Sequence, residues 1–320
     1  MKTKLPIIYS VLLLVLVAAC SFLTPPPTTT PIIESTPAPS ATESPHYTAA
    51  PVITETSAIE VTDTPSPSPT DYLTPTPTPG MEIKLSKKGP GRIKCPIFLY
   101  HRISIPENYN PNNINWRINP YYVLPDEFRK QIQMLNNWGY TTIPIKKLTN
   151  AISIGEKLPD RPIIITFDDG DESVYTQAFP IMKEFGFTGV IYLVYNYIGT
   201  PGYMTVDQIK ELAAAGWEVG SHSMTHSDLT TASSLNYEVM ISRRKLEILL
   251  HVPVRSFAYP FGKDDINLRN FVARYYTSAM GLGVYVTQRP GDQYYLWRKP
   301  IENGWDENYF ASFLPWSSKP

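Results

Sequence analysis

The chain has 320 residues, 28 Lys and Arg against 29 Asp and Glu, 32 prolines and two cysteines. This near-neutral balance excludes the strong basic footprint on which nucleic-acid binding depends. Two cysteines cannot supply a disulfide framework, so a folded domain here must be stabilised by its hydrophobic core. Nothing in the sequence indicates a protein partner.

The first 20 residues have the pattern of an export signal. Lys2 and Lys4 precede an apolar stretch over residues 5–19, which is short for a membrane-spanning helix of about 20 residues. The stretch ends in Val-Ala-Ala-Cys20, which resembles the bacterial lipoprotein signal, whose Cys is lipidated and becomes the new N-terminus. The alternative is an uncleaved anchor helix that happens to end in Cys. Both interpretations predict an extracytoplasmic protein held at a membrane, and the first predicts a lipid anchor on Cys20.

Residues 21–90 are predicted to be a disordered linker. They are dense in Pro and Thr and contain the run Thr-Pro-Thr-Pro-Thr-Pro-Gly over residues 74–80. Proline holds φ near one value and lacks a donor N–H, so such a segment stays extended and solvated. It also has too few large apolar residues to offset the entropy of folding.

From residue 91 to residue 320, short apolar runs alternate with longer amphipathic ones. Strands are expected over residues 96–101, 161–167, 188–194, 217–220, 256–261, 276–280 and 297–301. Helices are expected over residues 126–138, 173–185, 206–215, 234–250, 265–275 and 307–313. Alternation of this kind predicts a parallel sheet with helices outside it. We therefore expect one α/β domain over 91–320, a distorted (β/α) barrel of about seven strands.

Two motifs follow strands in this pattern. Thr-Phe-Asp168-Asp169-Gly closes an Ile-rich run, and His222 and His226 lie four residues apart in His-Ser-Met-Thr-His. Two imidazoles and one carboxylate suit a divalent metal with open positions for water and substrate, which is a catalytic rather than a structural metal site. In a parallel barrel the strand ends that carry these residues meet at one face.

These motifs resemble those of the polysaccharide deacetylases, the NodB-homology group or carbohydrate esterase family 4. Thr-Phe-Asp-Asp-Gly and His-Ser/Thr-x-x-His are that family's first two motifs, and the segment around Pro260-Phe261-Gly262 takes the place of its third, Arg-Pro-Pro-Tyr-Gly. The resemblance implies that Asp168 is the general base, that Asp169, His222 and His226 hold the metal, and that the Phe261 N–H helps to stabilise the oxyanion. Zinc is the expected ion, with nickel and cobalt as alternatives.

Two departures from the family pattern change the expected roles. No histidine follows His251, whereas most relatives have a late Leu-x-x-His whose His is the general acid. His101 ends the first strand, which resembles the circularly permuted branch with the biofilm poly-N-acetylglucosamine deacetylases, so we assign the acid to His101. His251 itself is expected to end a helix. Ala258 stands where many relatives have an Arg that orients the base, and Arg298 is one residue that could replace it.

The resemblance therefore predicts a metal-dependent enzyme that removes N-acetyl groups from N-acetylglucosamine in an extracellular or cell-envelope polysaccharide. An O-acetyl esterase of the acetylxylan type would use the same site. A carbohydrate-binding module that keeps the fold without turnover is the alternative from another class. Aromatic residues in loops could stack on sugar rings, but we assign no subsite from them; they are Trp116, Tyr121, Tyr122 and Tyr203.

Overall fold

The computed structural model of the chain describes residues 91–107, 109 and 119–318. The predicted signal peptide with Cys20, the predicted linker over 21–90, and Trp116 lie outside the described residues. Among the helices of the described part, none is long and apolar enough to cross a membrane.

The elements alternate along the chain much as the sequence predicts. The strands are β1 (Ile93–Lys94), β2 (Ile97–Tyr100), β3 (Arg102–Ile103), β4 (Tyr122–Val123), β5 (Thr141–Thr142), β6 (Pro162–Phe167), β7 (Val190–Leu193), β8 (Glu218–Ser221), β9 (Ser256–Ala258), β10 (Ser278–Met280), β11 (Thr287–Gln288) and β12 (Lys299–Pro300). The helices are α1 (Pro125–Asn137), α2 (Ile145–Ile154), α3 (Phe179–Glu184), α4 (Val206–Ala214), α5 (Ser242–Leu250), α6 (Ile266–Val272) and α7 (Glu307–Ser312).

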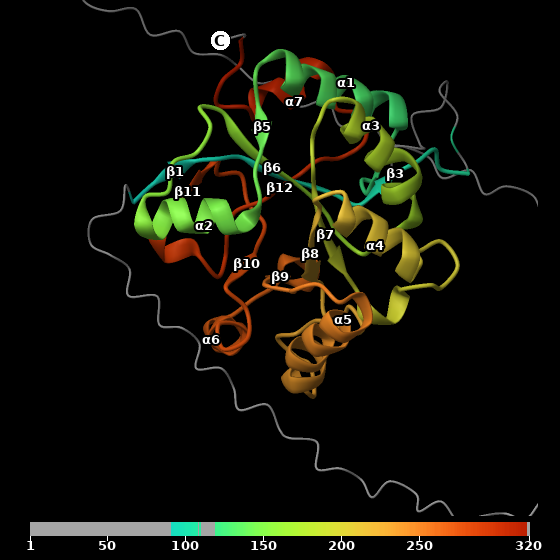
Figure 1. Cartoon of the computed structure of the whole chain (residues 1–320), viewed down its shortest axis with the longest axis vertical. Coiled ribbons are helices and arrows are strands. Elements are labelled where there is room, and N and C mark those ends of the chain that lie inside the picture. The colour runs from blue at the N-terminus through green and yellow to red at the C-terminus, as the bar shows by residue number, and fades with distance from the viewer. Residues whose placement is uncertain (1–90, 108, 110–118, 319–320) are drawn as a thin grey trace, which may run out of the picture. The chain divides into compact units, whose positions relative to one another are not determined.

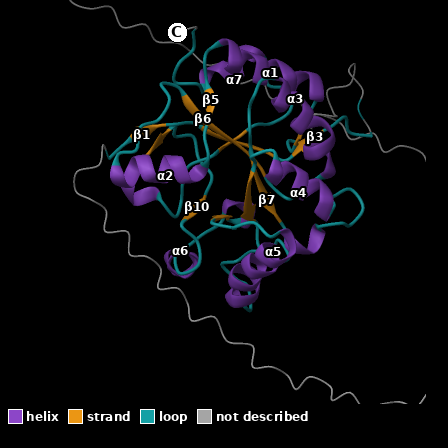
Figure 2. Cartoon of the chain, viewed as in Figure 1, coloured by secondary structure: helices purple, strands orange, loops and turns teal. Residues whose placement is uncertain are grey.

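The main sheet is parallel and curls into a barrel. Its strand order is β10-β9-β8-β7-β6-β2-β12, with β5 paired to the start of β6. The last segment joins its two edges, because Leu296 bridges to Met280 of β10 while β12 pairs with β2. In Figure 2 the strands lie in the middle of the domain and the helices surround them. The predicted α/β barrel of about seven strands is confirmed.

Side-chain alternation along the strands divides the core into two layers. In β6, Ile163 and Ile165 belong to the large cluster that faces the surrounding helices, while Ile164 belongs to a smaller cluster inside the barrel. Because successive side chains point to opposite faces of a strand, the next inward positions after Ile164 are Thr166 and then Asp168. The site residues therefore sit one step beyond the buried inner layer, at the carboxyl ends of the strands.

Helix α2 is an element that the sequence analysis did not predict. Its buried Ile145, Leu148 and Ile152 pack with strand residues of the inner cluster, so this helix covers the interior of the barrel. These residues recur at helical spacing, a pattern from which the helix could have been predicted. Figure 1 shows α2 beside β1. The helix ends at Gly155, whose φ of 75° is left-handed and suits glycine.

Several helix ends agree with the predictions. Thr205 caps α4 in a capping box with Gln208, and His251 ends α5 with a left-handed φ of 57°. The helices expected over 173–185 and 234–250 differ in one respect, because each begins with a π-helical turn, η2 (Val174–Ala178) and η4 (Asn236–Ile241). The strand expected to reach Phe261 ends at Ala258, and a short 3₁₀ turn follows it.

Candidate active site

One cavity of about 380 Å³ collects every site residue that the sequence analysis proposed. Its lining includes Asp168, Asp169, His222, His226, His101 and Phe261, and also Arg298. These residues come from the ends of β2, β6, β8 and β9 and from the segment before β12. The parallel barrel brings them together because it places all these carboxyl ends at one face.

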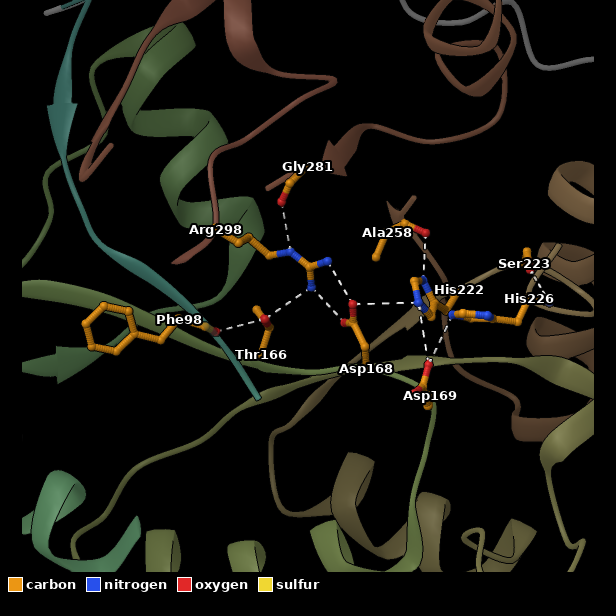
Figure 3. Close-up of polar contacts among 10 residues, drawn as sticks. All are labelled: Phe98, Thr166, Asp168, Asp169, His222, Ser223, His226, Ala258, Gly281 and Arg298. Carbon is orange, nitrogen blue, oxygen red and sulfur yellow. Dashed lines mark hydrogen bonds and ion pairs between the residues drawn. The ribbon is translucent and has the colours of Figure 1, made fainter. Parts of the chain in front are cut away.

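Asp168 is bound by Arg298 at the centre of this cavity. Both side chains are almost fully buried, at 2% and 1% exposed. The guanidinium donates two hydrogen bonds to the carboxylate, at 2.7 Å to Oδ1 and 2.8 Å to Oδ2 (Figure 3). Burial acts to raise the pKa of Asp168, but the charge and hydrogen bonds of Arg298 outweigh it and leave that pKa below its usual value. The pair therefore keeps Asp168 ionised and holds its plane in one orientation.

Arg298 is in turn held by a backbone carbonyl just after β10 and by a side chain of β6. Its Nε donates to the carbonyl of Gly281 at 3.3 Å, and a terminal nitrogen lies 3.3 Å from the hydroxyl of Thr166. That hydroxyl donates to the carbonyl of Phe98 at 2.9 Å. Arg298 thus lies beside Asp168, and Ala258 is buried inside the barrel.

Asp169, His222 and His226 form a convergent group whose members do not bond to one another. Oδ1 of Asp169 lies 3.6 Å from Nε2 of His222 and 3.5 Å from Nε2 of His226. These distances are too long for hydrogen bonds. Atoms that share a tetrahedral ion at about 2.0–2.2 Å lie roughly 3.3–3.6 Å apart. The Oδ1 atom is also buried without a hydrogen-bond partner among the described residues. This donor set fits a divalent metal ion.

The protonation of His222 suits a metal ligand. Its Nδ1 lies 2.8 Å from the carbonyl of Ala258 (Figure 3), and because a carbonyl only accepts, Nδ1 carries the hydrogen. Burial lowers the pKa of His222 more than the charge of Asp168 raises it. The neutral ring therefore presents an unprotonated Nε2 to Asp169, which is the tautomer that metal binding requires.

His101 lies on another wall of the same cavity. Its ring contacts the edge of Tyr121, with ring centroids 4.7 Å apart. Burial lowers the pKa of His101, and the charges of Asp168 and Asp169 oppose that effect in part. A lowered pKa makes the protonated imidazole a stronger proton donor.

Phe261 differs most from its expected setting. It has a left-handed φ of 60°, its side chain is 55% exposed, and its ring packs against His226 at 4.5 Å. The turn that contains it has backbone bonds from Gly262 and Lys263, whereas the Phe261 N–H has no partner within the described part of the chain. That N–H is available to a ligand.

Left-handed backbone conformations are concentrated around this cavity. Asp169, Ser223, His226 and Phe261 all have φ between 60° and 74°. Each such residue costs on the order of 1–3 kcal/mol and persists only where its surroundings enforce it. Gly170 continues the pattern with φ of 87°, and a Cβ there would lie 2.9 Å from the side chain of Leu193. This explains the glycine that ends the Asp-Asp-Gly motif.

The sequence left some residues at the site unidentified and named others only as candidates without an assigned role. Arg298 was one candidate for the residue beside Asp168, and only the fold shows that its side chain reaches Asp168 at the end of β6. Tyr121 lines the cavity, whereas Tyr122 accepts a hydrogen bond from Arg102 and Tyr203 packs on Tyr197. Glu238, which contacts the histidine loop, was not considered at all.

Comparison with known proteins agrees with this geometry. Residues 155–280 match the family model described as polysaccharide deacetylase. YxkH of Bacillus subtilis, whose name assigns it provisionally to the polysaccharide deacetylases, is 28% identical over 69% of this chain and 76% of its own length. A poly-beta-1,6-N-acetyl-D-glucosamine N-deacetylase of Staphylococcus epidermidis is 30% identical over 46% of this chain and 57% of its own length.

A solved structure supports the same assignment. The crystal structure of a polysaccharide deacetylase from Bacillus cereus superposes with a TM-score of 0.61 at 26% identity, covering 69% of each chain. The family match includes both the Asp-Asp and the His-x-x-x-His motifs, and the structural match extends over most of the barrel. The chain therefore contains a polysaccharide deacetylase domain, since that family model matches residues 155–280 and these relatives carry the family name.

Proposed function

We propose that this protein is a metal-dependent deacetylase that removes N-acetyl groups from N-acetylglucosamine units of an extracellular or cell-envelope polysaccharide. We further propose that it acts outside the cytoplasm, anchored by a lipid on Cys20 and extended from the membrane by the linker over 21–90. The observation that carries the activity is the ionised Asp168 beside the convergent group of Asp169, His222 and His226 in one cavity.

Each residue has a role that follows from its place. Asp169, His222 and His226 would hold the ion, with zinc the expected one. A divalent ion supplies a Lewis acid for the acetyl carbonyl and lowers the pKa of water, to about 7 in the case of zinc. Asp168 takes the proton of the attacking water, because its carboxylate is ionised and fixed by Arg298. The N–H of Phe261 donates to the oxyanion, and such a donor is worth roughly 10²–10³ in rate.

The leaving amine needs a proton, and His101 would supply it. It is the remaining histidine of the cavity, since His222 and His226 belong to the convergent group. The staphylococcal relative is named for deacetylation of poly-beta-1,6-N-acetyl-D-glucosamine, and this name supports N-acetylglucosamine units as the substrate.

The direct test is acetate release from four polymers: poly-N-acetylglucosamine, chitin oligomers, peptidoglycan and acetylxylan. We expect release from at least one N-acetylated polymer, loss of activity after a chelator, and recovery when zinc is added. Release from acetylxylan alone would establish the O-acetyl esterase instead. Saccharide binding without acetate release, at any added metal, would establish the binding module.

His101→Ala should distinguish amide from ester substrates. An amine is a poor leaving group unless it is protonated, so removal of the acid should lower the rate on N-acetyl substrates about 10²–10⁴-fold. An activated aryl ester leaves without protonation, so its hydrolysis should fall less than about 10-fold. The measurement is kcat/KM for both substrate classes. Tyr121→Phe is the matched control, because it keeps the ring that contacts His101. Equal losses on both substrates would make His101 a structural residue.

A further inference from the structure

The loop that carries the two histidines needs support from outside itself. Ser223 and His226 both have left-handed φ values, 74° and 65°, although neither is glycine. The loop makes one internal bond of note, from the N–H of His226 to the Ser223 hydroxyl at 2.8 Å (Figure 3). One hydrogen bond contributes less free energy than two strained residues cost together.

Two kinds of outside contact supply this support. The N–H groups of Tyr195 and Asn196 donate to the carbonyls of Ser223 and Met224 at 3.2 and 3.1 Å, and Glu238 binds the donors of the loop. Its side chain is buried, at 6% exposed. One carboxylate oxygen accepts the N–H groups of Met224 at 3.1 Å and Thr225 at 3.0 Å, and the other accepts the Thr225 hydroxyl at 2.7 Å. All three donors belong to the two residues between Ser223 and His226. Within residues 91–107, 109 and 119–318, no Lys or Arg forms an ion pair with Glu238.

A buried acid without a cationic partner is costly unless hydrogen bonds satisfy it. Here the bonds that satisfy it all come from the histidine loop, so the loop and Glu238 stabilise each other.

The π-helical turn η4 fixes Glu238 in turn. The Ser242 hydroxyl donates to the backbone carbonyl of Glu238 at 2.6 Å and lies 3.1 Å from the Ser221 hydroxyl. Ser221 is the residue directly before His222, so the start of the histidine segment is tied to the same turn. The Tyr276 hydroxyl also donates to the carbonyl of Val239 at 2.8 Å. Such π-helical turns inside helices are frequent at functional sites.

We infer that Glu238 is a positioning residue that sets the separation of His222 and His226 for metal binding. It touches neither the metal position nor the substrate cavity, and it acts through the backbone of Met224 and Thr225. This inference rests on the metal site in the proposed function. Residues that orient ligands in this way typically change metal affinity 10–100-fold.

The test is the zinc affinity of purified variants, measured by competition with a chromophoric chelator. Glu238→Ala should weaken zinc binding about 10–100-fold. Glu238→Gln should retain most of the affinity, because its amide oxygen can accept both N–H groups while its NH₂ donates to the Thr225 hydroxyl oxygen. Thr225→Ala removes one of the three hydrogen bonds and should weaken zinc binding by a smaller factor. It provides a second test in case Glu238→Ala does not fold.

Val239→Ala is the control for a general loss of stability. Val239 is fully buried on the same turn but packs into the outer core. It should lower the melting temperature without changing zinc affinity. Wild-type affinity in folded Glu238→Ala and Thr225→Ala would overturn the inference and leave the proposed function intact. A wild-type protein that binds no divalent ion would overturn both.

Discussion

Asp168→Asn should reduce acetate release about 10²–10⁴-fold while leaving metal binding intact. The amide cannot take a proton from water, and general-base catalysis is typically worth this much. The proposed ligands Asp169, His222 and His226 are unchanged, so the metal content should stay at the wild-type level. The measurements are kcat/KM for acetate release and metal content per protein chain.

Glu172→Gln provides the control for removal of a negative charge in the same segment. Glu172 is exposed and its side chain contacts Gln208, away from the cavity. This variant should keep wild-type activity. Full activity in Asp168→Asn would refute the assignment of Asp168 as the base, whereas loss of the metal in that variant would show that Asp168 belongs to the ligand set.

Arg298→Met should destabilise the folded protein by about 3–5 kcal/mol, because it leaves the buried Asp168 carboxylate without its partner. The cost should depend on pH. The folded-state pKa of Asp168 lies below its ordinary value, so the stabilisation by the pair is present above the unfolded-state pKa. It is lost as pH falls through the folded-state pKa. The difference between wild type and variant should therefore be large near pH 7 and shrink in acid, as measured by denaturant unfolding at several pH values.

Two further variants separate charge from geometry. Arg298→Lys keeps a positive charge but cannot donate to both carboxylate oxygens in one plane, so it should recover part of the stability and little of the activity. Arg129→Met removes an ion pair with Glu184 on the surface and should scarcely change stability, because exposed pairs contribute little. If Arg298→Met is as stable as Arg129→Met, the buried pair does not stabilise the fold.

Local patterns predicted the elements that carry the site. The Ile-rich run before Asp168 has to be a strand buried on both faces, and all residues of β6 are indeed buried. The helix end at His251 was also predicted, because helix ends depend on neighbours in the chain. Helix α2 was missed although its apolar spacing was present. The π-helical turns η2 and η4 had no signal, because a π-turn changes one hydrogen-bond register without changing the apolar period.

The sequence by itself determined the chemistry available to this protein. The spacing of Asp168 and Asp169, and of His222 and His226, is a local property, and it indicated a metal site together with a free carboxylate. Only the tertiary structure decided which distant residues complete the site. Arg298 reaches Asp168 because the last segment joins the two edges of the barrel, and Glu238 of η4 accepts the donors of the histidine loop. Contacts between residues so far apart in the chain arise from strand pairing and helix packing, which no local pattern encodes.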